Sequence, residues 1–311
     1  MQPVLRDLFQ MFYPPEPSIP SLQDRQRPVM TRLKIGLLAM AGLVVAAGMG
    51  GVVGAGAAIA LIKTSYNGPV NEDSRSELAV HSDVLGESVQ LGIRLPIEYA
   101  SDPDRRFPVL WVLDASHGDM VYRATQTLAQ AGIAEPSIVV ELPRSSVGRT
   151  EDFTPPQRIM HSAGGQGDRY LRFLETEAIP AVDEIFRTEP VRILVGHSLG
   201  GLFALYAFAE RWSLFDAHFV FSPSTWVGRQ AIVSVLQRTL RERPTDQTFL
   251  YLSLGSEEGN RMLSGFEAIR ATLTADAPPG LRWQMDMTTG ADHGSNPILS
   301  YPVAVSRYWG R

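Results

Sequence analysis

The sequence predicts an α/β fold, in which a mainly parallel central sheet carries helices on both faces and one N-terminal transmembrane helix precedes it. From residue 88 onward, short apolar runs recur, and helical patterns separate several of them. Short continuous apolar strands that alternate with helices are typical of a parallel sheet covered on both faces. Ahead of these runs lies one long apolar stretch, residues 35–62, that contains no charged residue.

The expected strands are short runs of mostly apolar residues, rich in β-branched and aromatic side chains. We expect them at 88–95, 108–113, 137–142, 191–196, 217–222, 248–255 and 281–288. The clearest helical patterns cover 168–187 and 199–210. No helical pattern lies between the first one or two strands, so we expect those strands to pair antiparallel.

The apolar stretch 35–62 holds 28 uncharged residues, whereas a helix needs only about 20 to cross the bilayer core. Arg32 and Lys34 precede the stretch, and only Lys63 follows it closely. By the positive-inside rule, the N-terminus then lies in the cytoplasm. We therefore expect a single-pass signal anchor in the cell (inner) membrane, with the domain on the periplasmic or extracytoplasmic side.

A cleavable signal peptide is the alternative, since Ala58-Ile59-Ala60 resembles a small-x-small cleavage site. The apolar stretch is much longer than the roughly 7–15 residues of a signal-peptide core and starts late, which favours an uncleaved anchor. The expected organisation is a cytoplasmic tail (1–34), the transmembrane anchor (35–62), a polar linker containing Gly-Pro (63–76) and one domain (77–311).

The composition excludes several kinds of chemistry. The chain has no cysteine, which rules out thiol nucleophiles, disulfides and thiolate metal sites. Its only lysines are Lys34 and Lys63, so the domain can form neither a Schiff base nor a Ser–Lys dyad. Residues 64–311 carry 22 basic and 30 acidic residues, a net charge of −8, whereas a nucleic-acid-binding surface is basic. We expect no nucleic-acid partner, no metal and no cofactor, and the oligomeric state stays open.

The strongest local signal is Gly196-His197-Ser198-Leu199-Gly200, which matches G-x-S-x-G. It lies between an expected strand and an expected helix, the context that this motif requires. The sharp turn strains the backbone of the serine, and neighbouring side chains would collide there, which explains the glycines. A chance match in a glycine-containing turn is the alternative. The context favours Ser198 as the nucleophile of an α/β-hydrolase fold.

The general base is reached by elimination among six histidines. In this fold the acid and then the histidine follow the serine along the chain, which leaves His218 and His293. His218 lies inside an apolar strand and is expected in the core. His197 is adjacent to Ser198, and adjacent residues at a strand end point to opposite sides. His293, in a turn-rich loop after the last strand, is therefore the expected general base and later general acid.

The acid should leave the C-terminal end of a strand between Ser198 and His293. The strand expected at 248–255 runs into Ser256-Glu257-Glu258-Gly259, so Glu257 and Glu258 both fit. The residues alone leave the choice between them open.

An oxyanion hole needs two backbone N–H donors. One is expected from Leu199, directly after the nucleophile. The other should come from the loop after the strand at 108–113, which reads Asp114-Ala115-Ser116-His117-Gly118. Ser116 is the candidate there.

These segments together resemble the esterase family of α/β-hydrolases that includes esterase D, the mycolyltransferase antigens and the trilactone-siderophore esterases. The resemblance covers roughly residues 77–309 and departs from the family where its usual Asp-Gly is Asp114-Ala115 here. It rests on the G-x-S-x-G turn, Ser82-Asp83-Val84-Leu85-Gly86-Glu87 with Arg94-Leu95-Pro96, Phe107-Pro108-Val109-Leu110, Asp152-Phe153-Thr154-Pro155, Phe221-Ser222-Pro223-Ser224 followed by Trp226, and Asp292-His293-Gly294.

The siderophore-esterase branch is the most similar one, and the similarity has implications for the site. The acid of that branch tends to fall three residues after a glycine, which selects Glu258 after Gly255. The segment with Trp226 matches one that lines the substrate pocket. Arg149 lies in a loop expected near that pocket, where it could meet an anionic substrate. The resemblance thus implies Trp226 and Arg149 as substrate-binding residues.

We therefore expect a serine carboxylic-ester hydrolase that forms an acyl-enzyme and acts on a small-molecule ester, with a siderophore-like ester or lactone as the candidate substrate. Two alternatives stay open. In the first, a sugar or lipid alcohol resolves the acyl-enzyme, which makes the protein an acyltransferase. In the second, the chain is a non-catalytic, membrane-anchored binding protein built on a hydrolase fold.

Overall fold

The computed structural model describes residues 64–67, 75–242 and 248–310. The chain divides into two compact units, 1–60 and 61–311, and all described residues belong to the second. The expected cytoplasmic tail (1–34) and transmembrane anchor (35–62) lie outside the described residues. Within the ranges that are described, no helix combines the length and the apolar character needed to cross a bilayer.

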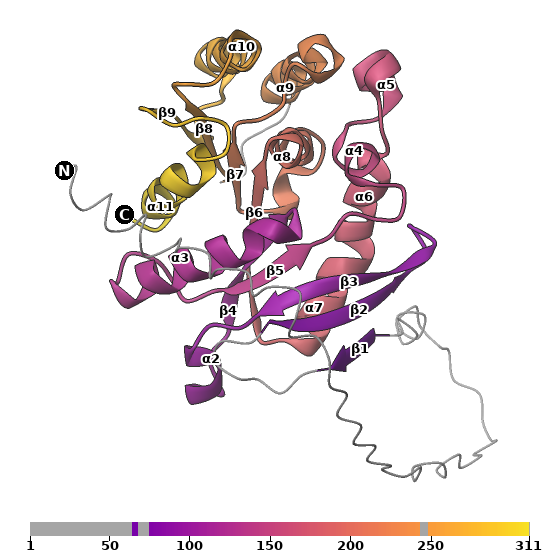
Figure 1. Ribbon diagram of the computed structural model, residues 1–311, viewed down its shortest axis with the longest axis vertical. Coiled ribbons are helices and arrows are strands. Elements are labelled where there is room, and N and C mark those ends of the chain that lie inside the picture. The colour runs from indigo at the N-terminus through magenta and orange to yellow at the C-terminus, as the bar shows by residue number, and fades with distance from the viewer. Residues whose placement is uncertain (1–63, 68–74, 243–247, 311) are drawn as a thin grey trace, which may run out of the picture. The chain divides into compact units, whose positions relative to one another are not determined.

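The described strands form one sheet in the order β1-β2-β3-β5-β4-β6-β7-β8-β9 (Figure 1). Neighbours from β5 through β9 run parallel, whereas β1, β2 and β3 pair antiparallel with their neighbours. The bounds are β1 (Thr64–Asn67), β2 (Ser76–Ser82), β3 (Glu87–Arg94), β4 (Phe107–Leu113), β5 (Ile138–Leu142), β6 (Thr188–His197), β7 (Ala217–Phe221), β8 (Phe249–Gly255) and β9 (Arg282–Thr288). The prediction of a mainly parallel sheet with an antiparallel start is confirmed.

The structure departs from the sequence prediction at the start of the sheet. The segment 63–76, expected as a linker, contains β1 and the first residue of β2. Strand β2 had not been expected either, although Leu78 and Val80 are buried while Glu77 and His81 are exposed. This alternation is typical of a strand with one buried face. Strand β1 depends on pairing with β2, a partner that its own four residues do not reveal.

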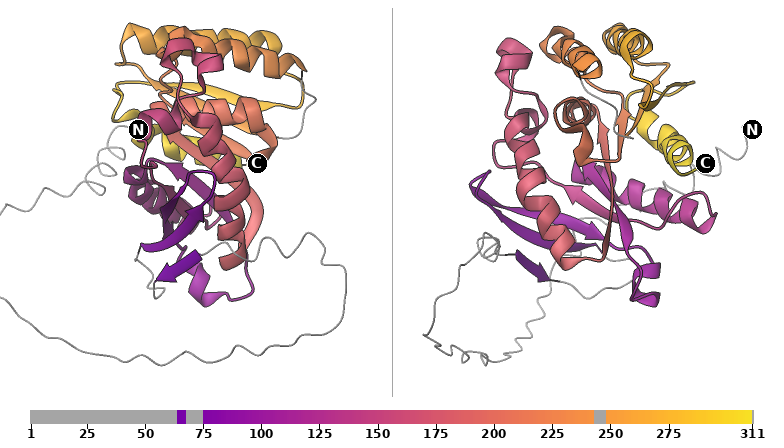
Figure 2. Two further views of the ribbon diagram at one scale, coloured as in Figure 1. Left: turned by 90° about the vertical axis from the view of Figure 1, so that its right-hand side faces the viewer. Right: turned by 180° about the vertical axis from the view of Figure 1, so that it is seen from behind.

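Helices cover the sheet on both faces, as Figures 1 and 2 show. One face packs against α3 (Gly118–Gln130) and α11 (Asn296–Trp309). The other face packs against α6 (Gly167–Phe173), the π-helical η3 (Leu174–Ala178), α7 (Ile179–Ile185), α8 (Leu199–Arg211), α9 (Ala231–Glu242) and α10 (Asn260–Asp276). The remaining described helices are α2 (Glu98–Ser101), α4 (Arg149–Phe153) and α5 (Gln157–Met160), with the 3₁₀ turns η1 (Ala115–His117), η2 (His161–Ala163), η4 (Trp212–Leu214) and η5 (Val227–Gln230).

The two-sided cover explains why the central strands are mostly apolar. Every residue of β4, β5, β7 and β8 is buried, so these strands show no alternation of polar and apolar residues. Parallel strands end at one edge of a sheet, and ligand sites of open α/β sheets lie outside that edge. The loops after β4, β6, β7, β8 and β9 therefore share the edge where we look for the site.

Candidate active site

Ser198 occupies a strained turn between β6 and α8. Its backbone angles are φ 60° and ψ −117°, a combination that a non-glycine residue rarely adopts. A side chain on Gly196 would collide with the carbonyl oxygen of Gly200, so the turn needs glycine there. The N–H of Ser198 donates to the carbonyl oxygen of Phe221 at 3.0 Å, which joins the turn to the end of β7. The geometry is that of a nucleophile elbow.

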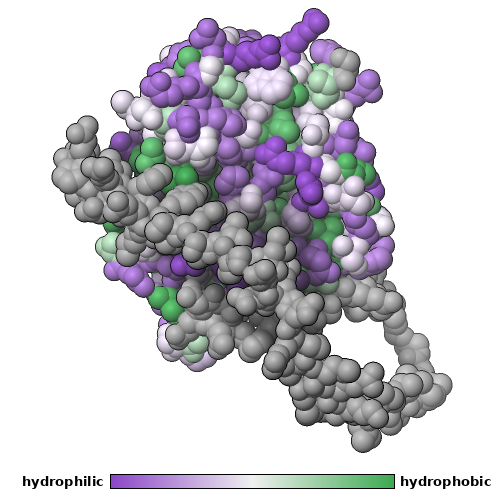
Figure 3. Space-filling view, in the orientation of Figure 1, coloured by the Kyte–Doolittle hydropathy of each residue, from purple (hydrophilic) through white to green (hydrophobic). Residues whose placement is uncertain are grey.

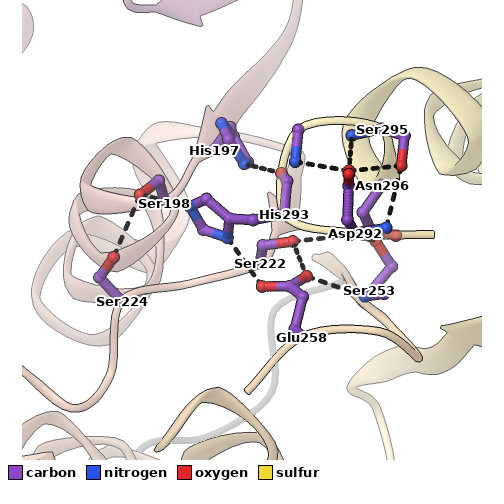
Figure 4. A network of polar contacts seen from close by, with 12 residues as sticks. His197, Ser198, Ser222, Ser224, Ser253, Glu258, Asp292, His293, Ser295 and Asn296 are labelled. Carbon is purple, nitrogen blue, oxygen red and sulfur yellow. Dashed lines mark hydrogen bonds and ion pairs between the residues drawn. The ribbon is translucent and has the colours of Figure 1, made fainter.

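The structure brings Ser198, His293 and Glu258 into one chain of contacts (Figure 4). Ser198 Oγ lies 2.9 Å from His293 Nε2, and His293 Nδ1 lies 2.7 Å from Glu258 Oε2. Glu257 is different, because its side chain is exposed and its backbone N–H donates to the carbonyl oxygen of Ala291. The geometry thus places Glu258, and not Glu257, beside the histidine.

The Glu258 carboxylate is buried and fully engaged. Its Oε1 accepts hydrogen bonds from Ser222 Oγ at 2.6 Å and from the backbone N–H of Gly255 at 2.9 Å. Burial alone would raise the pKa of Glu258, but the hydrogen bonds from His293, Ser222 and Gly255 outweigh it and hold the pKa below its usual value. Glu258 is therefore ionised at neutral pH and can accept the Nδ1–H of His293.

A second layer of polar side chains supports Glu258, and the sequence had not indicated it. Asn296, fully buried at the start of α11, donates to Ser222 Oγ at 2.8 Å and to Ser253 Oγ at 3.0 Å (Figure 4). Ser253 in turn lies 2.8 Å from the hydroxyl of Ser300. The only available signal was the presence of Ser222, Ser253 and Ser300 between apolar residues.

The loop that carries His293 is held from two sides. The carboxylate of Asp292 accepts hydrogen bonds from the backbone N–H groups of Gly294 and Ser295, at 3.0 and 2.8 Å. The hydrogen bond between Glu257 and Ala291 joins this loop to the one after β8. The imidazole thus projects from a closed turn whose position is fixed relative to Glu258.

His197 contacts the backbone of the loop that carries His293, a contact that the sequence did not indicate. It points to the α3 and α11 side of the sheet, as alternation along β6 requires. Its Nε2 nevertheless lies 2.8 Å from the backbone carbonyl oxygen of His293, so Nε2 carries the proton and donates. The two rings are 4.6 Å apart. Burial and the neighbouring histidines lower the pKa of His197 to about 4, so its ring is neutral at pH 7.

Arg149, expected to bind substrate, is paired with Asp114 at the end of β4. Its Nε and Nη2 lie 2.6 and 2.7 Å from the two carboxylate oxygens of Asp114. Nη2 is also 3.4 Å from the carbonyl oxygen of His197. The arginine therefore links the loop after β4 to the turn that carries Ser198.

The expected oxyanion donors lie at adjoining ends of two elements. Leu199 is the first residue of α8, and Ser116 lies in η1 directly after β4. A Cβ on Gly200 would lie 3.2 Å from Leu113 Cβ and 3.4 Å from Asp114 Oδ2, so the end of β4 borders the start of α8. Ser116 is exposed. The assignment of these two N–H groups stays a prediction.

Trp226 lies two residues after Ser224 along the chain. It is 46% exposed and borders two surface hollows of about 440 and 480 Å³. One hollow reaches Met160 and His161, and the other reaches Asn260 at the start of α10. Hydrophilic residues gather over α9 and α10 at the upper rim of the molecule in Figure 3. A substrate role for Trp226 stays a prediction.

His218 belongs to the core, as the sequence indicated. It is fully buried in β7, and its ring lies edge-on to Phe208 and Phe215. Burial lowers its pKa to about 3, so the ring is neutral. In the described part of the chain, no group of three or more His, Cys, Asp or Glu side chains is placed to hold a metal ion.

Comparison with known proteins adds a family and a fold. The family model described as "Putative esterase" matches residues 82–279. Siderophore triacetylfusarinine C esterase of Aspergillus fumigatus is 39% identical over 80 residues, 25% of this chain and 27% of that protein. Siderophore enterobactin esterase of Emericella nidulans is 35% identical over 102 residues, 31% of this chain and 34% of that protein. The matched segments thus span about a quarter to a third of these two relatives.

Solved structures resemble the chain over a larger part of its length. An IroE-like serine hydrolase from Shewanella oneidensis has a TM-score of 0.70 at 22% identity and covers 76% of this chain and 80% of its own. Siderophore hydrolase EstB from Aspergillus nidulans has a TM-score of 0.65 at 22% identity and covers 78% and 97%. At these identities the likeness shows the fold.

Proposed function

The chain belongs to the "Putative esterase" family, and we propose that it is a serine carboxylic-ester hydrolase with Ser198 as nucleophile, His293 as general base and acid, and Glu258 as the acid that orients the histidine. One observation carries this proposal. The hydroxyl of Ser198, on a strained turn at a helix N-terminus, lies 2.9 Å from Nε2 of His293. Nδ1 of the same ring lies 2.7 Å from the buried carboxylate of Glu258.

The roles follow from the contacts. Ionised Glu258 accepts the Nδ1–H of His293 and so leaves Nε2 as the lone pair that faces Ser198. As Ser198 Oγ attacks an ester carbonyl, its proton passes to Nε2. The N–H of Leu199, and in our proposal that of Ser116, then hold the oxyanion. His293 returns the proton to the leaving alcohol, and a water repeats the sequence to release the acid.

We further propose a siderophore-like ester or lactone as the substrate. The names of the two curated relatives support this class, because both describe siderophore esterases. Trp226 supports it as well, because it is exposed beside two hollows, lies two residues after Ser224 along the chain, and offers an aromatic surface that suits a bulky substrate. From the sequence alone we also propose a location outside the cytoplasm at the inner membrane, because the apolar stretch 35–62 is expected to be an uncleaved anchor.

Turnover of graded esters tests the proposal. We expect wild-type protein to hydrolyse p-nitrophenyl acetate and a trilactone siderophore, and Ser198→Ala to hydrolyse neither. Hydrolysis of the short ester without the trilactone would remove the siderophore class and keep the esterase. Product analysis with added sugar or lipid alcohol detects acyl transfer in place of hydrolysis. If wild type and Ser198→Ala turn over every ester equally slowly, the hydrolase itself is refuted.

Protease accessibility tests the location. In spheroplasts of cells that make the full chain, we expect added protease to degrade the domain without lysis. A domain protected until lysis contradicts the outward orientation.

A further inference from the structure

A second hydroxyl touches the nucleophile. Ser224 Oγ lies 3.2 Å from Ser198 Oγ, and Ser224 is only 3% exposed (Figure 4). The sequence had singled out the segment around Ser224 only as part of a pocket lining. The structure instead places this side chain against the atom that would attack the substrate.

The direction of this hydrogen bond follows from the number of protons. The Ser198 hydroxyl has one proton, which points to the lone pair of His293 Nε2 at 2.9 Å. Ser198 Oγ can therefore only accept from Ser224. The hydroxyl of Ser224 is then the donor, and its proton points at Ser198 Oγ.

The position of Ser224 is built into the fold. Its backbone N–H donates to the carbonyl oxygen of Ser198 at 3.0 Å, so backbone and side chain of Ser224 both bind the nucleophile residue. Two residues earlier, Ser222 donates to Glu258. The short segment Ser222-Pro223-Ser224 thus contacts both ends of the chain of polar contacts, the acid through one hydroxyl and the nucleophile through the other.

We infer that Ser224 is a further catalytic residue, which stabilises Ser198 Oγ by hydrogen bonding whenever that oxygen carries negative charge; this inference rests on the proposed function. During attack, the Oγ–C bond forms, the Ser198 proton moves to His293 Nε2, and the π pair of the ester carbonyl moves to its oxygen, which becomes the oxyanion. During deacylation, a water adds to the acyl carbon and gives a proton to His293 Nε2; the C–Oγ bond then breaks, its electron pair stays on Oγ, and Nε2 passes that proton to Oγ. Ser224 keeps its own proton throughout and acts as a donor already in place.

Loss of the Ser224 hydroxyl should lower the rates of attack and deacylation. A hydrogen bond to a charged oxygen changes a rate by about 10- to 100-fold. Because Ser224 faces Ser198, its loss should slow attack and deacylation and leave the binding of the ester unchanged.

The experiment compares full-length wild type, Ser224→Ala and Ser224→Cys in two assays. The first is the rate of labelling by a fluorophosphonate, which reports attack alone, and the second is kcat and KM for p-nitrophenyl acetate. Ser137→Ala is the matched control, since Ser137 is also fully buried but donates to the carbonyl oxygen of Glu135 at the start of β5. Thermal unfolding of each variant is measured beside the rates.

We expect Ser224→Ala to lower the labelling rate and kcat by about 10- to 100-fold, with KM and Tm close to wild type. Ser224→Cys keeps a weaker donor, so its labelling rate and kcat should lie between those of wild type and Ser224→Ala. If Ser224→Ala does not fold, Ser224→Cys tests the inference. Ser137→Ala should label as wild type does. Wild-type labelling rates in both Ser224 variants, or a change confined to KM or Tm, overturn the inference and leave the proposed function intact. Wild-type protein that does not label at all refutes the proposed function, and the inference falls with it.

Discussion

Arg149 binds both carboxylate oxygens of Asp114, at 2.6 and 2.7 Å, and the pair joins the end of β4 to the nucleophile turn. Asp114 has a φ of 63°, so the chain turns sharply just where an oxyanion donor is expected. A two-pronged arginine–carboxylate pair fixes both distance and orientation. We therefore expect Arg149 to position the loop with Ser116 and to contribute less to substrate binding than its sequence position indicated.

Replacing Arg149 by lysine keeps the charge and removes the two-pronged geometry. We expect Arg149→Lys to lower kcat by roughly 10-fold, as for the loss of a hydrogen bond to a charged group, with little change in KM. Steady-state kinetics on p-nitrophenyl esters measure the split. Arg158→Lys, at an exposed pair with Asp168, serves as the control and should match wild type. A raised KM with unchanged kcat in Arg149→Lys would instead support direct contact with substrate.

His197 donates to the backbone carbonyl oxygen of His293, which predicts a role in holding the base loop. His197→Phe keeps a ring of similar size and loses the donor, so kcat should fall several-fold to about 10-fold. His197→Gln can place an N–H near the same carbonyl oxygen and should retain more activity. The kinetics of the two variants, measured side by side, check this order. Equal kcat in both variants would show that the donor has no role.

The two neighbouring glutamates provide a matched pair of variants. Glu258→Gln removes the charge that orients His293, and we expect kcat to fall by about 10²- to 10⁴-fold, as for other triad acids. Glu257→Gln changes the same side chain at an exposed position and should leave kcat near wild type. Measuring kcat at pH 7 for both variants distinguishes them. A large loss in Glu257→Gln, with Glu258→Gln active, would reverse the assignment.

The burial of His218 predicts how the free energy of unfolding depends on pH. The folded pKa of His218 is about 3 because of burial, whereas an unfolded histidine titrates near 6.5. Between these values the unfolded state binds more protons, so the free energy of unfolding falls as the pH falls, by at most about 1.4 kcal/mol per pH unit from this group. The stability that depends on a neutral His218 is thus complete above about pH 6.5 and is lost progressively as the pH falls from about 6.5 to about 3.

His218→Phe removes this contribution without leaving an apolar site empty. Urea unfolding at pH 7 and pH 5 should show that the variant loses about 2 kcal/mol less than wild type over this interval. An unchanged pH dependence in His218→Phe would mean that burial does not lower the pKa of His218.

Local patterns in the sequence were enough for most of the fold. Most of the seven expected strands are runs of predominantly apolar residues, and Ser198 lies in a motif whose glycines and flanking elements are contiguous. The order of residues along the chain then pointed to His293. Between Glu257 and Glu258, adjacent acids in one turn, the residues alone could not decide, because only the folded turn shows which side chain is buried.

The sequence did not predict the contacts between segments that are distant along the chain. Asp114 and Arg149, His197 and His293, and Ser198 and Ser224 each lie on different loops or strand ends that the sheet brings together. Nothing in the spacing of these residues along the chain encodes the distance between them. Strand β1 escaped prediction for the same reason, since it exists through its pairing with β2.

Mapping the site of a covalent adduct tests the central claim most directly. The protein is treated with a fluorophosphonate, digested, and its peptides are sequenced by mass spectrometry. The account predicts one phosphonylated residue, Ser198, with labelling that is abolished in Ser198→Ala and strongly slowed in His293→Ala. An adduct on another residue, or equal labelling of wild type and Ser198→Ala, would contradict the assignment of Ser198 as the nucleophile.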